Sequence, residues 1–125
     1  MSVLLDSDTV VEILHSRDQA ILSQWEALAS TGRLILFSPI TAAEVWAGMR
    51  SSEQQVIARF FGQLTCIPVE YNIGHLAGEF LRQLSKSHNL KIGDALIAAA
   101  AMQSHAALWT RNRKHYPMTG LTFYS

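Results

Sequence analysis

Short runs of apolar residues alternate along this chain with stretches in which apolar residues recur every three or four positions. A short uninterrupted apolar run is typical of a strand that is buried on both faces, and the three-to-four spacing predicts an amphipathic helix. The pattern predicts strands over 3–5, 34–37, 66–69, 106–110 and 121–124. It predicts helices that open near residues 7 and 41, helices over 19–29, 53–64 and 73–87, and one more that begins at Asp94.

Strands that alternate with helices indicate an α/β domain with a mainly parallel sheet of about four to five short strands, flanked by helices on both faces. Pro68 interrupts the third strand, and proline cannot donate a hydrogen bond to a sheet, so we expect this strand at an edge. In such sheets the functional site lies beyond the carboxyl ends of the strands, where neighbouring strands send their connections to opposite faces.

Four polar residues fall on that edge of the predicted sheet. Asp6 ends the first strand, and Glu44 lies in the first turn of the helix after the second strand. Asp94 starts the helix that leads to the fourth strand, and Asn112 lies just past the end of the fourth. We therefore expect Asp6, Glu44, Asp94 and Asn112 to lie together.

Each acidic residue also has a purely structural explanation. Asp94 and Asp8 stand where helix N-caps belong, and the spacing from Thr41 to Glu44 is that of a capping box. Capping explains each residue separately, but it does not explain why they occupy the same edge. Glu12, one helical turn after Asp8, is interpreted as part of a solvated helix face.

Three carboxylates within a few ångström of one another would repel and would raise one another's pKa unless a cation neutralised them. Oxygen ligands favour Mg²⁺ or Mn²⁺, and neither the five histidines nor the single cysteine shows a metal-ligand spacing. A carboxylate-held Mg²⁺ ion is a frequent tool of phosphodiester hydrolysis, because it orients a water molecule and stabilises charge on the phosphate.

Composition limits the remaining possibilities. A chain of 125 residues, 49% hydrophobic and 16% charged, is expected to form a single domain over 1–125. Cys66 cannot form an internal disulfide and is predicted to be buried, which suits a reducing cytoplasm. We expect no signal peptide, and no apolar run approaches the roughly 20 residues that a membrane span needs.

Ten Lys and Arg residues balance ten Asp and Glu residues, so no overall basic excess indicates nucleic-acid binding, and such a surface would have to be local. The densest basic segment lies beside Asn112, and Lys91 precedes Asp94. These residues are interpreted as phosphate contacts, with a solvated loop as the alternative. The predicted contacts are Arg111, Arg113, Lys114 and Lys91, with His115 beside them.

Four short segments surround the acids and Asn112. They are Leu4-Leu5-Asp6-Ser7-Asp8, Ser38-Pro39-Ile40-Thr41-Ala42-Ala43-Glu44, Gly93-Asp94-Ala95-Leu96-Ile97-Ala98-Ala99 and Leu108-Trp109-Thr110-Arg111-Asn112. In this order they resemble the four motifs of PIN domains. The order and spacing are most similar to those of the small VapC-like ribonuclease toxins of bacterial and archaeal toxin–antitoxin pairs, and the resemblance covers essentially the whole chain.

The resemblance implies a PIN-like three-layer fold and a Mg²⁺- or Mn²⁺-dependent endoribonuclease in which a metal-activated water attacks the scissile phosphate of RNA. It implies that Asp6, Glu44 and Asp94 are the metal-binding catalytic carboxylates. Asn112 stands where the family has Asp or Asn and is expected to be a fourth catalytic residue. Thr110 matches a Ser or Thr beside the site and is expected to contact the substrate. The resemblance also implies a homodimer and a cognate antitoxin whose C-terminal segment covers the groove.

The chain departs from the family pattern at two positions. Asp8 stands where Asn is usual, and Asn112 is neutral, so three firm carboxylates remain. We expect one tightly held metal ion, with any second ion arriving with the substrate phosphate. One alternative is a catalytically inactive PIN-fold binding module. Another is a receiver-like signalling domain. That class requires an adjacent acidic pair after the first strand, an Asp where Ser38 stands and a Lys after the last strand, and this chain has none of the three.

Overall fold

The computed structural model describes residues 1–125 and has the alternating elements that the sequence predicts. The strands are β1 (Ser2–Leu5), β2 (Ile35–Phe37), β3 (Thr65–Cys66) and β4 (Ala106–Trp109). The α-helices are α1 (Ser7–His15), α2 (Gln19–Ala29), α3 (Pro39–Ala47), α4 (Gln54–Gly62), α5 (Tyr71–His88) and α6 (Ile92–Gln103), and the 3₁₀ turns are η1 (Ser51–Glu53) and η2 (Arg113–His115).

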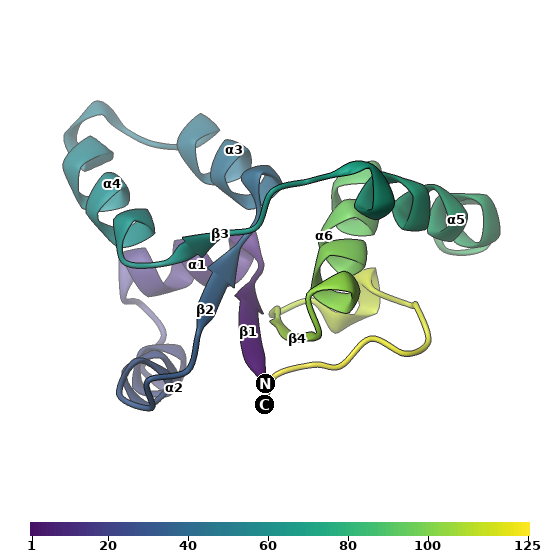
Figure 1. Ribbon diagram of the computed structural model, residues 1–125. Helices are drawn as coiled ribbons and strands as arrows, with labels where there is room; N and C mark the ends of the chain where they lie inside the picture. Colours follow the sequence, from purple (N-terminus) through teal and green to yellow (C-terminus); the bar gives the residue numbers. More distant parts are fainter.

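The four strands form one parallel sheet in the order β3-β2-β1-β4. Leu4 of β1 lies between Leu36 of β2 and Leu108 of β4. The chain steps outward from β1 to β2 and β3, and then crosses back through α5 and α6 to place β4 on the other side of β1 (Figure 1). The direction of winding therefore reverses between β1 and β4, which is where a sheet of this kind forms its site.

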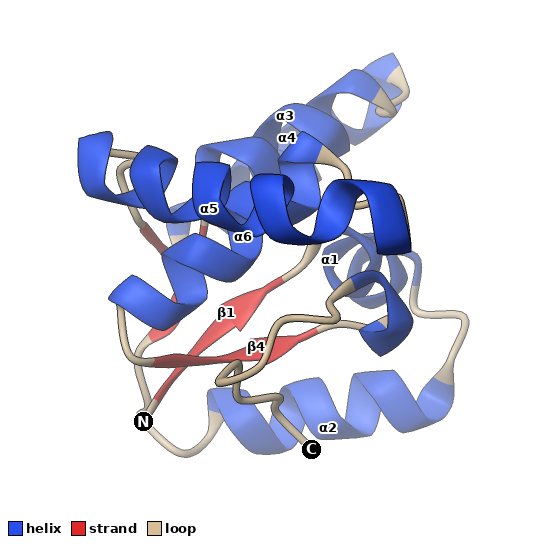
Figure 2. Ribbon diagram, turned by 90° about the vertical axis from the view of Figure 1, so that its right-hand side faces the viewer, coloured by secondary structure: helices blue, strands red, loops and turns tan.

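Helices cover both faces of the sheet. Alternate residues of a strand point to opposite faces, so Leu4 packs toward α5 and α6, whereas Val3 and Leu5 pack toward the layer of α1 to α4. Figure 2 shows α5 and α6 above β1 and β4 and α2 below them, so the strands lie between two helical layers. The prediction of a three-layer α/β fold is confirmed.

The alanine-rich helix α6 packs directly against one face of the sheet. Ala95 and the run from Ala98 to Ala101 are completely buried. Small side chains allow the backbone of α6 to approach both β4 and α5, because no large group holds the elements apart. The N-cap of α6 is Lys91, and Asp94 lies in the first turn. The capping explanation for Asp94 is therefore wrong.

Two strand predictions are wrong in part. The segment 121–124 meets β4 at a single bridge, Leu108 to Phe123, with backbone hydrogen bonds only between Leu108 and residues 122 and 124. β3 is two residues long, as expected for an edge strand that runs into Pro68. Cys66 lies on this short edge and is exposed, so its predicted burial is also wrong. No helix is long and apolar enough to cross a membrane.

Candidate active site

The residues that directly follow three neighbouring strands meet at the carboxyl edge of the sheet. Asp6 follows β1, Ser38 follows β2 and Thr110 follows β4, and all three are buried. The Thr110 hydroxyl donates to Asp6 Oδ2 at 2.9 Å, across the point where the winding reverses. The sheet therefore places a buried, hydrogen-bonded carboxylate at the position that the strand order favours for a site.

Asp6 is held by three donors. Its Oδ1 accepts the Ser7 N–H at 2.8 Å as the N-cap of α1, and its Oδ2 accepts the hydroxyls of Thr110 at 2.9 Å and of Tyr116 at 2.7 Å. A carboxylate offers about four lone-pair positions, so about one remains for a further ligand. That position is on Oδ1, because Oδ2 already accepts two hydrogen bonds.

Asp94 faces Asp6 from the first turn of α6. Its Oδ1 lies 3.4 Å from the Tyr116 hydroxyl, and the side chain is half-buried. Burial raises the pKa of Asp94, the negative charges of Asp6 and Glu44 raise it further, and His115 opposes them. The three predicted carboxylates thus act on one another electrostatically, as expected for acids that share an edge.

Glu44 is exposed and lies in the second turn of α3, since the helix begins at Pro39 and not at Thr41. The prediction that Glu44 occupies the first turn is therefore wrong. The capping box is wrong for the same reason, because Ser38 Oγ accepts the Thr41 N–H at 3.2 Å. The Glu44 side chain instead lines a groove of about 330 Å³ with Asp8 and Arg111.

Asp8 and Asn112 form a direct pair. The Asn112 side-chain amide donates to Asp8 Oδ2 at 2.9 Å, and the Arg111 N–H donates to the same oxygen at 3.2 Å. Burial and the charge of Asp6 raise the pKa of Asp8, while these hydrogen bonds oppose the rise. Asn112 therefore lies beside the edge where the sequence placed it, and Asp8 does not cap α1, because Asp6 does so.

The predicted basic residues fall into separate environments. Arg111 pairs with Glu12 at 3.4 Å and with Asp18 at 3.5 Å. Arg113 is turned toward the C-terminus, where it donates to the Tyr124 carbonyl at 3.2 Å. The two predicted lysines, in contrast, line a second groove of about 190 Å³ that reaches Asp94. Its lining consists of His88, Asn89, Leu90, Lys91, Asp94, Lys114 and His115.

Comparison with known families decides the identity of this fold. The sequence model of the PIN domain matches residues 3–120. This chain belongs to the PIN domain family. Over 117 residues it is 32% identical to Ribonuclease VapC10 of Mycobacterium tuberculosis, an alignment that covers 93% of this chain and 86% of that protein. It is also 32% identical over 113 residues to Ribonuclease VapC19 of the same species, with 89% of this chain and 90% of VapC19 covered.

A solved structure has the same arrangement as this PIN domain. It is the crystal structure of VapBC2 from Rickettsia felis bound to a DNA fragment from the VapBC2 promoter. It superimposes on this chain with a TM-score of 0.80 at 26% sequence identity. The alignment covers 99% of this chain and 98% of the other, so the helices and strands of this PIN domain have counterparts in that structure.

Two residues of this PIN domain were missed by sequence reasoning. Glu12 is only 6% exposed and bonds Arg17 and Arg111 at 3.4 Å each, so its interpretation as a solvated residue is wrong. Tyr116 is 3% exposed and contacts both Asp6 and Asp94. Burial and the charge of Asp6 raise the pKa of the Tyr116 hydroxyl far above its usual range. Its signal in the sequence is weak: Tyr116 and Met118 are apolar positions in a polar segment.

The donor chemistry of this edge fits a hard divalent cation. The candidate ligands are all carboxylate oxygens, the class that Mg²⁺ and Mn²⁺ prefer. As the side chains are placed, no three His, Cys, Asp or Glu residues lie close enough together to hold a metal ion. Glu44 is exposed and lies close enough to raise the pKa of Asp94.

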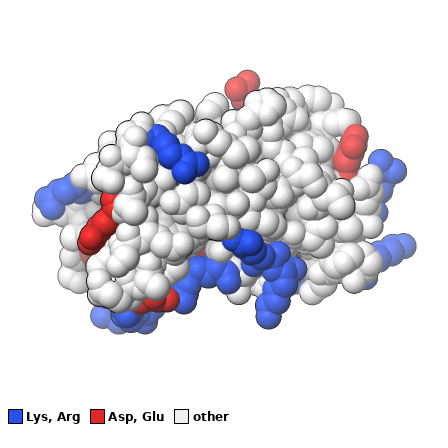
Figure 3. Space-filling model, turned by 90° about the horizontal axis from the view of Figure 1, so that it is seen from below, with Lys and Arg blue, Asp and Glu red and all other residues white.

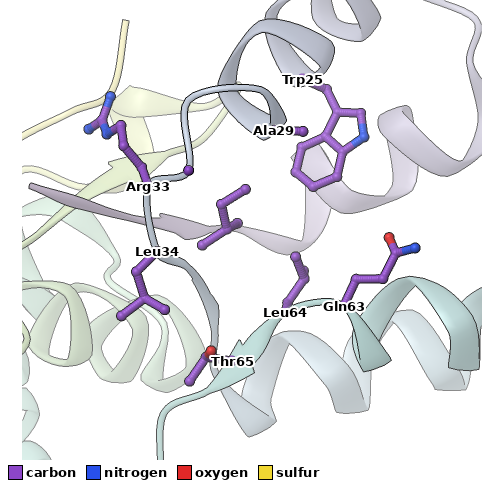
Figure 4. A pocket seen from close by; sticks show the side chains of 9 residues that line it. Trp25, Ala29, Arg33, Leu34, Gln63, Leu64 and Thr65 are labelled. Carbon is purple, nitrogen blue, oxygen red and sulfur yellow. The ribbon is translucent and has the colours of Figure 1, made fainter.

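The largest cavity of this PIN domain lies away from these acids. It has a volume of about 390 Å³ and is formed where β2 and β3 begin, between the end of α2 and the end of α4. Trp25, Leu34, Gln63 and Leu64 line it, and no acidic residue does (Figure 4). Seen from below, the side on which β1 begins, acidic side chains are scattered singly and form no cluster (Figure 3). The acids gather at the opposite, carboxyl edge.

Proposed function

We propose that this PIN domain, acting as a single unit over residues 1–125, is a Mg²⁺- or Mn²⁺-dependent endoribonuclease and the toxin of a toxin–antitoxin pair. One observation carries the proposal: Asp6 and Asp94 approach one hydroxyl at the point where the sheet reverses its winding, with Glu44 close enough to raise the pKa of Asp94. The 32% identity to ribonucleases VapC10 and VapC19 supports the same activity.

In this proposal Asp6, Glu44 and Asp94 hold the metal. A bound ion would polarise an oxygen of the substrate phosphate and would lower the pKa of a water molecule. The chain holds the Asp6 carboxylate in place through Ser7, Thr110 and Tyr116. Asn112 completes the site indirectly, because its amide fixes the Asp8 carboxylate at the border of the groove that Glu44 lines.

RNA contacts are proposed on both sides of the acids. Lys91 and Lys114 flank Asp94 in one groove, and Arg111 lies with Glu44 in the other. These cations would bind phosphates next to the cleaved bond, which gives a chain of zero net charge the local basic surface that it needs. Arg113 would contribute only after leaving the Tyr124 carbonyl.

The partners follow from the same family likeness. We propose a homodimer in the cytoplasm, as the family resemblance implies. We also propose a cognate antitoxin, which the likeness to the VapBC2 structure of Rickettsia felis supports. The antitoxin would cover the groove beside Glu44, where Val11 and Arg111 offer an apolar contact and a charge.

One observation favours a second function, that of a catalytically inactive binding module. No three acidic side chains are close enough to bind a metal as they stand, and Asn112 is neutral. A true loss of the site would leave the protein without a response to divalent cations.

Cleavage of total cellular RNA by purified, antitoxin-free protein separates the two functions. We expect discrete fragments in Mn²⁺ or Mg²⁺ that disappear in EDTA and in Asp6→Asn. Glu79→Gln is the matched control, since Glu79 lies on α5 and pairs only with His75 at 3.7 Å. Cleavage that persists in Asp6→Asn, or a folded wild type that neither binds Mn²⁺ nor cuts RNA, would contradict the endoribonuclease.

A further inference from the structure

Tyr116 connects the two layers that contribute the carboxylates. Its ring is buried in the core formed with α5 and α6, and only its hydroxyl reaches the carboxyl edge of the sheet. There it lies 2.7 Å from Asp6 Oδ2 and 3.4 Å from Asp94 Oδ1. Asp6 belongs to the β1–α1 junction and Asp94 to α6, so Tyr116 is a common contact of both acids.

A phenol has one proton, and the distances decide where it goes. The 2.7 Å contact to Asp6 has the length of a charge-assisted hydrogen bond, whereas 3.4 Å to Asp94 is too long for a strong one. The Tyr116 proton is therefore directed chiefly to Asp6, and Asp94 lies at the long end of the same donor's reach. Because Oδ2 accepts both the Tyr116 and the Thr110 hydroxyls, the free lone pair of Asp6 is on Oδ1, and the phenol oxygen lies between the two carboxylates.

Thr110 alone would not fix Asp6 equally well. Both donors bind Oδ2, so removal of the Tyr116 hydroxyl leaves that oxygen with a single hydrogen bond. The Ser7 N–H and the Thr110 hydroxyl would then hold one oxygen each, and a free lone pair would be open on Oδ2 as well as on Oδ1. Residues that bond to a metal-binding carboxylate in this way commonly change metal affinity by about 10- to 100-fold when they are replaced.

We propose that Tyr116 is a positioning residue of the site, which orients the Asp6 carboxylate for the metal and sets its spacing from Asp94. The inference rests on the proposed function, because it assigns a role within the same site. It concerns a side chain that touches neither metal nor RNA but acts through the two acids.

The test compares wild type, Tyr116→Phe and Tyr124→Phe. Tyr116→Phe keeps the buried ring and removes only the hydroxyl. Tyr124→Phe makes the same chemical change on a ring that packs against Trp109, 5.1 Å between centroids, and whose hydroxyl bonds neither carboxylate. Mn²⁺ binding is followed by the electron paramagnetic resonance signal of the free ion, folding by thermal melting, and cleavage by kcat and KM over a range of Mn²⁺ concentrations.

For Tyr116→Phe we expect Mn²⁺ affinity to fall by about 10-fold, the lower end of the range for such contacts. The kcat should fall at limiting Mn²⁺ and recover at saturating Mn²⁺, with the KM for RNA unchanged. Tyr124→Phe should match wild type in Mn²⁺ affinity. A role in packing alone would lower the melting temperature without changing Mn²⁺ affinity.

The outcomes separate this inference from the function on which it rests. Equal Mn²⁺ affinity in wild type and Tyr116→Phe overturns the positioning role even if RNA is cleaved. Wild-type protein that binds Mn²⁺ and cuts no RNA refutes the endoribonuclease, while a weaker Mn²⁺ affinity of Tyr116→Phe still upholds the positioning role. Wild-type protein that does not bind Mn²⁺ overturns both.

Discussion

Replacement of Asp94 by Asn removes one negative charge from the acidic edge and keeps the shape of the side chain. In the metal-free protein Asp94 is half-buried and faces Asp6 across the Tyr116 hydroxyl. Its ionised form is therefore unfavourable, and its pKa is raised. We expect Asp94→Asn to be more stable than wild type at neutral pH in EDTA, although it abolishes the proposed metal site.

Two opposing effects set the size of the gain. Through their shared contact with Tyr116, the Asp6 and Asp94 oxygens lie at most about 6 Å apart, where two charges repel by about 3 kcal/mol at an effective dielectric constant near 20. Solvent around the half-exposed Asp94 reduces this repulsion to roughly 1–2 kcal/mol. Against it stands the attraction of a carboxylate to the N-terminus of α6, about 0.3–1 kcal/mol. Repulsion prevails, with a net gain of about 1 kcal/mol.

The gain depends on pH in a defined direction. Because the pKa of Asp94 is higher in the folded state, the folded protein binds this proton more tightly than the unfolded chain does. The free energy of unfolding of wild type therefore falls as pH rises from the ordinary value of 3.8 through the folded-state pKa. Asn does not titrate, so the advantage of Asp94→Asn is complete at neutral pH and shrinks toward acid pH.

Thermal melting in EDTA at low salt, between pH 4 and 7.5, measures this effect. A gain of about 1 kcal/mol raises the melting temperature of a domain of this size by about 4 °C. Mn²⁺ should reverse the order, because a ligand at 100 times its Kd stabilises wild type by about 2.7 kcal/mol and Asp94→Asn hardly at all. Equal or lower stability of Asp94→Asn at pH 7 in EDTA would refute the repulsion, as would a difference that does not change with pH.

Two further predictions concern the charged residues around the acids. Glu12→Gln should lower the free energy of unfolding by about 1 kcal/mol, because the substitution removes the charge that pairs with Arg17 and Arg111, both of which remain partly in water. Urea unfolding measures this change, and an unchanged urea midpoint would contradict the anchoring of the two arginines by Glu12. Lys114→Ala should weaken the binding of RNA in EDTA. The slope of the logarithm of the binding constant against the logarithm of the salt concentration should become shallower by about 0.7, and an unchanged slope would mean that Lys114 contacts no phosphate.

The sequence was most informative where backbone geometry leaves little freedom. Parallel strands point the same way, so residues that follow apolar runs share an edge, and this principle placed Asp6 at the edge where Asp94 approaches the same hydroxyl. Thr110, which donates to Asp6, was indicated only by the family resemblance. The buried character of α6 was equally accessible, since a run of alanine and isoleucine without a polar face has no stable exposed arrangement.

The sequence was least informative where packing between distant segments decides the outcome. Glu12 has the spacing of a solvated position, and besides the nearby Arg17 its burial is compensated by Arg111, 99 positions later in the chain. Tyr116 reaches Asp6 because the turn η2 returns the chain over β1. The C-terminal segment meets β4 only around Leu108, and the Tyr124 carbonyl accepts from Arg113 instead of from a strand. No local pattern encodes any of these encounters.

The pair formed by Asp8 and Asn112 bears on whether the neutral residue at 112 indicates a lost activity. The Asn112 amide donates to Asp8 Oδ2 at 2.9 Å. A carboxylate at position 112 would face that of Asp8 in place of this hydrogen bond, with Asp6 already raising the pKa of Asp8. With an acid at position 8, electrostatics thus favours a neutral hydrogen-bond donor at position 112. Asn112 is accordingly better explained as the partner of Asp8 than as a sign of decay, which favours the endoribonuclease over the inactive binding module.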